Sequence, residues 1–177
     1  MSTWKIDPSH SHAQFTVRHL MIANVRGEFT KVSGTVTLDE TDVTRSQAEA
    51  VIQTASIDTR DEKRDTHLRS ADFFDAEKNP TITFRSTSVK KVSEEEVAVT
   101  GDLTIRGVTM SVVLKVEGPT PAAKTPWGGI KRGASASTKI SRKAFGLEWN
   151  AALETGGVLV GDEVKISLEL ELELDQA

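Results

Sequence analysis

The chain has 177 residues, which is enough for one domain of ordinary size with an adequate core. Its formal net charge of −4 gives no reason to expect a nucleic-acid partner. Because it contains no cysteine, disulfides, thiolate nucleophiles and cysteine-ligated metal sites are excluded.

The N-terminal stretch MSTWKIDPSH shows no basic region followed by an apolar run, which is the pattern of a secretory leader. No run elsewhere approaches the ~18 apolar residues of a membrane-spanning helix. We therefore expect a cytoplasmic protein. The alternative is a periplasmic or secreted mature form whose leader has been removed.

In the first half of the chain, apolar and polar residues alternate in the manner of β-strands. Five strands are predicted there, at Thr3–Ile6, Ala13–His19, Val25–Leu38, Gln47–Ile57 and Thr81–Val89. The stretch SIDTRDEKRDTHLRSADFFD at 56–75 interrupts this pattern with charges at helical spacing. It therefore needs a separate explanation.

We predict a short helix from Arg60 to about Ser70, started by a capping box between Thr59 and Glu62. A helix this polar is not stable by itself in water. Phe73 and Phe74 are expected to clamp it to the body of the protein as a plug or lid at one end. Its polar side chains would then lie at the rim of a cavity, and these are Arg64, Asp65 and His67. The alternative is a plain surface helix with solvated charges.

The second half of the chain is also strand-like. Apolar residues fall on odd numbers from Val97 to Ile105 and on even numbers from Val108 to Val116, so we predict a hairpin turning near Gly107. A strand follows at Ile130–Ser141. The last strand, Lys165–Leu174, alternates leucine or isoleucine with charged or small polar residues. The intervening segments 118–129 and 150–161 are predicted loops.

Roughly eight long amphipathic antiparallel strands make this an all-β chain, with one domain over residues 1–177. Such strands bury their apolar faces either in a sandwich or in a closed barrel, and an eight-stranded barrel is just filled by side chains or holds one small ligand. The small residues of ASAS at 134–137 favour a hollow barrel, because they leave space rather than filling it.

Histidines are the candidate metal ligands. His10 and His12 lie two residues apart, so on a strand they would share one face and could supply two zinc ligands, with His19 or His67 as a third. His12 does not share the parity of His19, which aligns with Phe15 and Val17 on an apolar face. His19 is therefore either a core histidine or a donor to a ligand head group. We expect no metal and no cofactor.

Nine sequence blocks, read in order over most of the chain, resemble the YceI-like family of polyisoprenoid-binding proteins with a lipocalin-like barrel. The blocks are WKIDPSHS at 4–11, FTVRHL at 15–20, VRGEF at 25–29, SIDT at 56–59, RDTHL at 64–68, DFFD at 72–75, PTITFRS at 80–86, GDLTIRGVT at 101–109 and ISRKAFG at 140–146. The resemblance implies an eight-stranded antiparallel barrel with the helix near one end and a long apolar tunnel.

It also implies an isoprenoid or similar long-chain amphiphilic lipid as the ligand, stored or transported with no covalent chemistry. The alternative is a metal-dependent enzyme, with histidine ligands, that acts on a lipid. A homodimer and transient contact with a membrane are further expectations. The expected lipid-binding residues are Phe15, Val17, His19, Asp65, His67, Leu68, Phe73, Phe84, Leu103, Ile105, Val112, Leu114, Ile140 and Phe145.

Overall fold

The computed structural model describes residues 1–154 and 156–176, and its strands close into a barrel. Residue 155, within the second predicted loop, and residue 177 lie outside the described residues. The strands are β1 (Ser2–Ile6), β2 (His12–His19), β3 (Ala23–Phe29), β4 (Val32–Leu38), β5 (Gln47–Gln53), β6 (Ile57–Asp58), β7 (Thr81–Lys91), β8 (Glu96–Ile105), β9 (Val108–Glu117), β10 (Ala123–Lys124), β11 (Ile130–Ser141) and β12 (Val160–Leu174). The helix α1 spans Glu62–Arg69, and short 3₁₀ turns occur at Val43–Arg45, Thr54–Ser56 and Lys143–Phe145.

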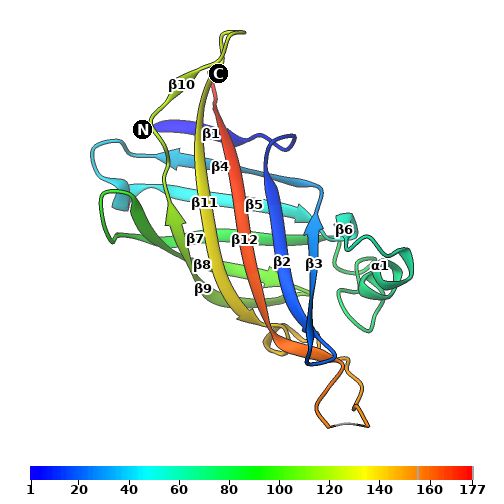
Figure 1. The fold of residues 1–177 in the computed structure, drawn as a ribbon. Coiled ribbons are helices and arrows are strands. Elements are labelled where there is room, and N and C mark those ends of the chain that lie inside the picture. The colour runs from blue at the N-terminus through cyan, green and yellow to red at the C-terminus, as the bar shows by residue number, and fades with distance from the viewer. Residues whose placement is uncertain (155, 177) are drawn as a thin grey trace.

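Eight antiparallel strands form the closed ring, in the order β11-β9-β8-β7-β5-β4-β1-β12, and the pairing of β12 with β11 completes it. On its other side β12 bonds to β1 near its C-terminal end and to β2 along the rest of its length. From β2 the sheet continues to β3 and β6 (Figure 1). The predicted eight-stranded barrel is therefore confirmed.

Alternation explains why these segments form the barrel wall. In β12 the side chains at 166, 168, 170 and 172 face the interior, while those at 165, 167 and 169 are exposed. The predicted hairpin is also confirmed, because Ile105 pairs with Val108 across a turn in which Arg106 and Gly107 both have positive φ angles of 51° and 74°. This is the backbone geometry that tight β-hairpins prefer.

Two predicted strands are each broken in two. The segment Val25–Leu38 is interrupted at residues 30–31, and Gln47–Ile57 is interrupted by the turn Thr54–Ser56. The two breaks lie together, since the Thr30 N–H donates to the Ser56 carbonyl at 3.1 Å. Here β3 pairs with β2 and β6, whereas β4 pairs with β1 and β5. The chain changes partners at a barrel corner, which explains both interruptions.

The helix starts two residues later than the sequence predicts, and the expected capping box is wrong. Asp61 is the N-cap, with its carboxylate accepting from the Arg64 N–H at 3.1 Å. Thr59 instead donates its N–H and its hydroxyl to the Asp65 carboxylate, at 3.0 and 2.5 Å. Asp65 is 4% exposed, so the expectation that it presents a charge at a cavity rim is also wrong. Burying a carboxylate is costly, and the two bonds from Thr59 offset part of that cost.

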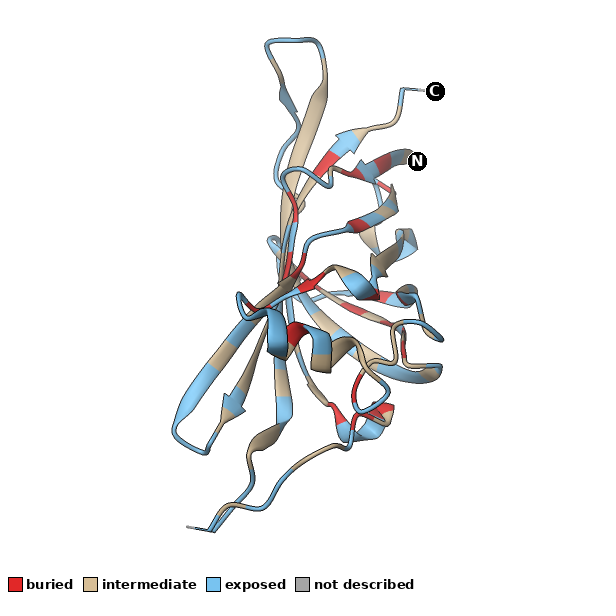
Figure 2. Cartoon of the chain, turned by 90° about the vertical axis from the view of Figure 1, so that its right-hand side faces the viewer, coloured by how far each residue is buried: buried red, intermediate tan, exposed pale blue. Residues whose placement is uncertain are grey.

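Helix α1 covers one side of the barrel, where it faces the viewer in Figure 2. Phe73 is 5% exposed, and the Phe74 ring meets Phe29 edge-on with centroids 5.7 Å apart. The Arg106 guanidinium donates to the carbonyls of Ala71 and Phe73, which fixes the segment after the helix. The predicted phenylalanine clamp is confirmed. In the described residues there is no helix long and apolar enough to span a bilayer.

Candidate functional site

The larger of two chambers inside the barrel has a volume of about 190 Å³. Its wall is drawn from nearly every strand of the barrel, and Leu68, Phe73 and Phe74 of the helical segment complete it. At the far side Val17 and Val160 line it where β2 meets the start of β12. The side chains are almost all hydrocarbon. The chamber can therefore solvate an apolar group but offers few partners to water.

A second chamber of about 130 Å³ adjoins the first, deeper toward β4 and β8. Ala134 and Ala136 form part of its wall, so the small residues of β11 do leave space, as the sequence suggests. Six residues border both chambers: Ile6, Ala50, Phe84, Leu114, Leu168 and Leu170. Phe84 and Ala50 are directly paired across β5 and β7, so they lie at the junction.

These volumes are too large to be packing defects. Protein interiors pack as densely as organic crystals, and a void of about 10–15 Å³ already holds one water molecule. Water is poorly held in hydrocarbon walls because it needs two or more polar partners. A folded barrel that keeps this much apolar space has room for a hydrophobic ligand.

Eleven of the fourteen expected lipid-binding residues line the larger chamber. They are Phe15, Val17, Leu68, Phe73, Phe84, Leu103, Ile105, Val112, Leu114, Ile140 and Phe145. Strand parity places the strand residues among them on the inner face, whereas Leu68 reaches the chamber from α1, Phe73 from the turn after it and Phe145 from a 3₁₀ turn. Their contact with a lipid stays a prediction.

The other three expected residues, His19, Asp65 and His67, are not part of the chamber walls. Asp65 is engaged by Thr59, as described above. His67 Nε2 lies 2.9 Å from the Asp72 carboxylate, and its ring meets Trp149 edge-on at 4.7 Å. His19 ends β2 opposite Val160 and is half-buried. His67 thus holds α1 against the segment that contains Trp149.

Arg142 is a site residue that the sequence does not single out, although it is the arginine of the ISRKAFG block. It is 5% exposed and lines the larger chamber. Its guanidinium donates to four backbone carbonyls, those of Leu147 (2.5 Å), Gly161 (2.7 Å), Trp149 (3.0 Å) and Val160 (3.1 Å). Burial lowers its pKa, and the nearby Asp162 carboxylate opposes that shift. Arg142 therefore anchors the segment that closes this end of the barrel.

The histidines considered as candidate metal ligands, His10 and His12, have different partners. His10 Nδ1 lies 2.9 Å from Asp7 and 3.6 Å from Glu171, whereas His12 is near Glu28. Among the described residues, the one group with metal-ligand spacing is Asp7, His10 and Glu171. The Lys131 ammonium lies within it, 2.7 Å from Asp7 and 2.6 Å from Glu171. This cluster is a salt-bridge network that ties the turn after β1 to β11 and β12.

This network predicts a pH-dependent contribution to stability. The hydrogen bond from Lys131, aided by His10 and Ser9, holds the pKa of Asp7 well below its usual range. A depressed carboxylate pKa stabilises the fold above the ordinary value of about 3.9, and this contribution is lost as the pH falls through the folded-state pKa. We expect Asp7→Asn to lower the thermal midpoint most near pH 7, with the deficit shrinking below pH ~4.

Thermal unfolding of both proteins at a series of pH values measures this deficit. Asp102→Asn, which makes the same change on the exposed outer face of β8, is the matched control and should leave the midpoint nearly unchanged. A deficit that is the same at pH 7 and at pH 2 would contradict the assignment.

Comparison with known proteins agrees with this architecture. The family model of the YceI-like domain matches residues 4–172. A UPF0312 protein of Staphylococcus epidermidis is 39% identical over 176 residues, covering 99% of both chains. A UPF0312 protein of Staphylococcus aureus is 37% identical over 177 residues, covering 99% of this chain and all of the relative.

Solved structures show the same barrel. BcnA of Burkholderia cenocepacia superposes with a TM-score of 0.80 at 26% identity, covering 94% of this chain and 98% of that one. The YCEI protein of Campylobacter jejuni gives 0.76 at 32% identity, with 90% of each chain covered. A polyisoprenoid binding domain from Saccharophagus degradans gives 0.71 at 18% identity, covering 99% of this chain and all of that one, which shows the fold alone. From the family match and these relatives, the chain belongs to the YceI-like family.

Proposed function

We propose that the protein binds the tail of a long-chain isoprenoid, or a similar amphiphilic lipid, inside the barrel and stores or transports it without covalent chemistry. The observation that carries this proposal is the pair of adjoining apolar chambers. The Saccharophagus degradans domain with this fold is described as polyisoprenoid binding, which supports the choice of ligand class.

The energetics suit a reversible carrier. Burial of a tail is worth up to ~0.8 kcal/mol per methylene relative to water, although ligands of this size realise nearer ~0.3 kcal/mol per heavy atom. A bilayer offers the same tail a comparable apolar environment. Transfer between membrane and barrel is therefore close to balanced, so the cargo can be both taken up and released.

In this proposal the chamber-lining residues hold the tail, and the polar head remains outside the apolar wall. His67 is a proposed contact for the head, because its side chain is 38% exposed and packs against Phe73, which lines the chamber. His19 is a second proposed contact at the other side of the barrel, at the end of β2. Asp65 is not proposed as a contact, because it is buried and Thr59 occupies its carboxylate.

The experiment is organic extraction of the freshly purified protein followed by mass spectrometry. We expect a long-chain isoprenoid or a related lipid in a near-stoichiometric amount. Delipidated protein should then take up farnesol added from ethanol, with saturable binding. If the extract holds no lipid and the delipidated protein does not bind farnesol or longer prenyl alcohols, the proposal fails.

We further propose that the protein forms a homodimer and that it lies in the cytoplasm. A homodimer is expected from the long exposed strands and from the family resemblance, and sedimentation velocity at several protein concentrations tests it. The cytoplasm is the expected compartment, and fractionation of cells that produce the full-length protein tests that expectation.

A further inference from the structure

The turn between β2 and β3 carries three consecutive exposed apolar residues. Leu20, Met21 and Ile22 are 38%, 51% and 76% exposed, and we call them the apolar tip. The Ile22 N–H donates to the His19 carbonyl at 3.2 Å, so the tip is a tight hairpin turn. The Arg18 guanidinium donates to the Met21 carbonyl at 3.2 Å. The turn thus exposes hydrocarbon to solvent, although Met21 also lies beside Gly157.

The backbone of this turn favours other residues. Leu20 and Met21 have φ angles of +53° and +62°, a conformation that bulky side chains rarely adopt. They are the central residues of the turn from His19 to Ile22, inside a three-residue loop, and turns with positive φ at both central positions favour Asn-Gly. Leu20 and Met21 therefore have a strained backbone conformation, and both of their apolar side chains are partly exposed to water. Strain of this kind is concentrated where a segment has a role beyond folding.

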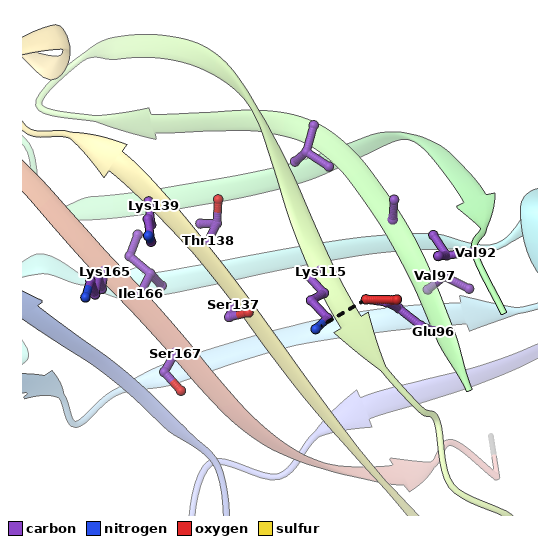
Figure 3. Close-up of a pocket in the computed structure, with 12 residues that line it drawn as sticks. Val92, Glu96, Val97, Lys115, Ser137, Thr138, Lys139, Lys165, Ile166 and Ser167 are labelled. Carbon is purple, nitrogen blue, oxygen red and sulfur yellow. Dashed lines mark ion pairs between the residues drawn. The ribbon is translucent and has the colours of Figure 1, made fainter. Parts of the chain in front are cut away.

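A row of basic residues crosses the outer face of four neighbouring strands, β11, β12, β2 and β3. Strand pairing places Lys139 opposite Lys165, Lys165 opposite Thr16, and Thr16 opposite Arg26, while Arg18 lies two residues farther along β2. We call these four cations, Lys139, Lys165, Arg26 and Arg18, the basic row. Figure 3 shows Lys139 and Lys165 on neighbouring strands beside an outer groove of about 560 Å³.

The basic row is unneutralised. None of its members forms an ion pair with any described residue, although Lys115 across the groove is paired with Glu96 at 3.6 Å. Glu163, two residues before Lys165 on the same face, pairs with neither lysine. Like charges directly opposite one another weaken a sheet. Four neighbouring cations without ion pairs, on a chain whose net charge is −4, favour an anionic partner.

We propose that the apolar tip inserts into the surface of an anionic lipid bilayer, with the basic row facing the phosphate groups. The spacing suits a segment that inserts its tip and holds its cations near the phosphate groups. At ~3.3 Å per residue, Arg18 lies roughly 7 Å from the tip along β2, and the level of Lys165 and Arg26 lies roughly 13 Å from it. The tip is too small for a stable protein interface, but its apolar-and-basic composition is that of membrane-surface segments.

This inference rests on the proposed function, because a lipid carrier must meet the membrane that supplies its cargo. The tip adjoins the chamber directly: His19, its first neighbour, pairs with Val160, and Val160 lines the chamber together with Val17. Docking by the tip therefore places one end of the chamber next to the bilayer.

The test is co-sedimentation of the full chain with vesicles of phosphatidylcholine alone and with vesicles containing equal amounts of phosphatidylglycerol. We expect binding to the anionic vesicles that weakens with added salt. The double variant Leu20→Asn, Met21→Gly supplies the preferred turn and should fold at least as well, but bind on the order of tenfold more weakly. Lys165→Glu replaces a repulsive cross-strand pair with an attractive one and should bind about thirtyfold more weakly.

Trp127→Ser is the matched control, because Trp127 is 77% exposed in the hairpin at the opposite end of β12 and should not affect binding. Undiminished binding in the tip and basic-row variants, or a loss with Trp127→Ser, overturns the proposal. Farnesol uptake, measured without vesicles, should be unchanged in all variants. If the wild-type protein takes up farnesol but does not bind anionic vesicles, the docking surface is refuted and the proposed function is unaffected. The reverse result would refute the proposed function alone.

Discussion

Replacing Phe84 with alanine is expected to extend the range of lipid tails that the protein binds. Phe84 borders both chambers, and its ring packs over Gly101, where the neighbouring strand has no room for a side chain. Removing the ring widens the junction between the chambers. Each added isoprene unit of about five carbons should then tighten binding about tenfold beyond the length at which wild-type affinity levels off.

Titration with prenyl alcohols of increasing length, followed by tryptophan fluorescence, measures this profile. Ala50→Phe is the matched opposite change, because Ala50 pairs with Phe84 and an added ring would narrow the same junction. It should shorten the preferred tail. The Phe84→Ala variant should lose about 3 kcal/mol of stability or less, since its ring already borders empty space. Identical length profiles in the two variants would show that the junction does not limit the ligand.

Replacing Arg142 with methionine is expected to destabilise the protein by about 3–5 kcal/mol. The change keeps an apolar stem of similar length but removes the donors to four backbone carbonyls in the segment 147–161. The Val160 carbonyl keeps the Asn150 amide as a donor at 2.8 Å, but buried carbonyls left without a partner cost more than the bonds contribute when they are made. Urea unfolding should show a lower midpoint, and amide exchange should quicken around Leu147 and Trp149.

Arg85→Met is the control for this change, because Arg85 is 79% exposed and its ion pair with Glu49 lies at the surface. It should cost under about 0.5 kcal/mol. Arg142→Lys should recover only part of the loss, because one ammonium group cannot reach carbonyls in four directions. Equal stability of Arg142→Met and Arg85→Met would show that the four carbonyls find other partners.

The sequence predicts the barrel well because each wall strand has one solvent-exposed face and one apolar face that is turned to the interior. The period-two pattern of KISLELELEL locates β12, and the change of parity at Gly107 locates the β8–β9 hairpin. The alternation of apolar and polar residues does not reveal the barrel corners at residues 30–31 and 54–56. There the chain changes partner strands, and partner exchange depends on distant residues such as Ser56 for Thr30.

The chamber wall could be predicted for the same reason, since inward-facing apolar residues follow from strand parity. The positions of polar residues follow less directly from the sequence pattern. Thr59 and Asp61 are both good caps by residue type, and only the burial of Asp65 decides between them. Arg142 gives no local signal either, because its four partners are backbone carbonyls and carry no side-chain signature.

The double pairing of β12 has a consequence for how the protein is made. This strand follows all the others in the chain, yet it must bond to β11 on one side and to β1 and β2 on the other. While the ribosome is still adding its residues, the first two strands lack a partner they require, and their apolar faces stay open to water. Such long-range closure is slow and exposes the nascent chain to aggregation. The barrel can thus close only once synthesis has passed Leu174 and the strand has left the exit tunnel.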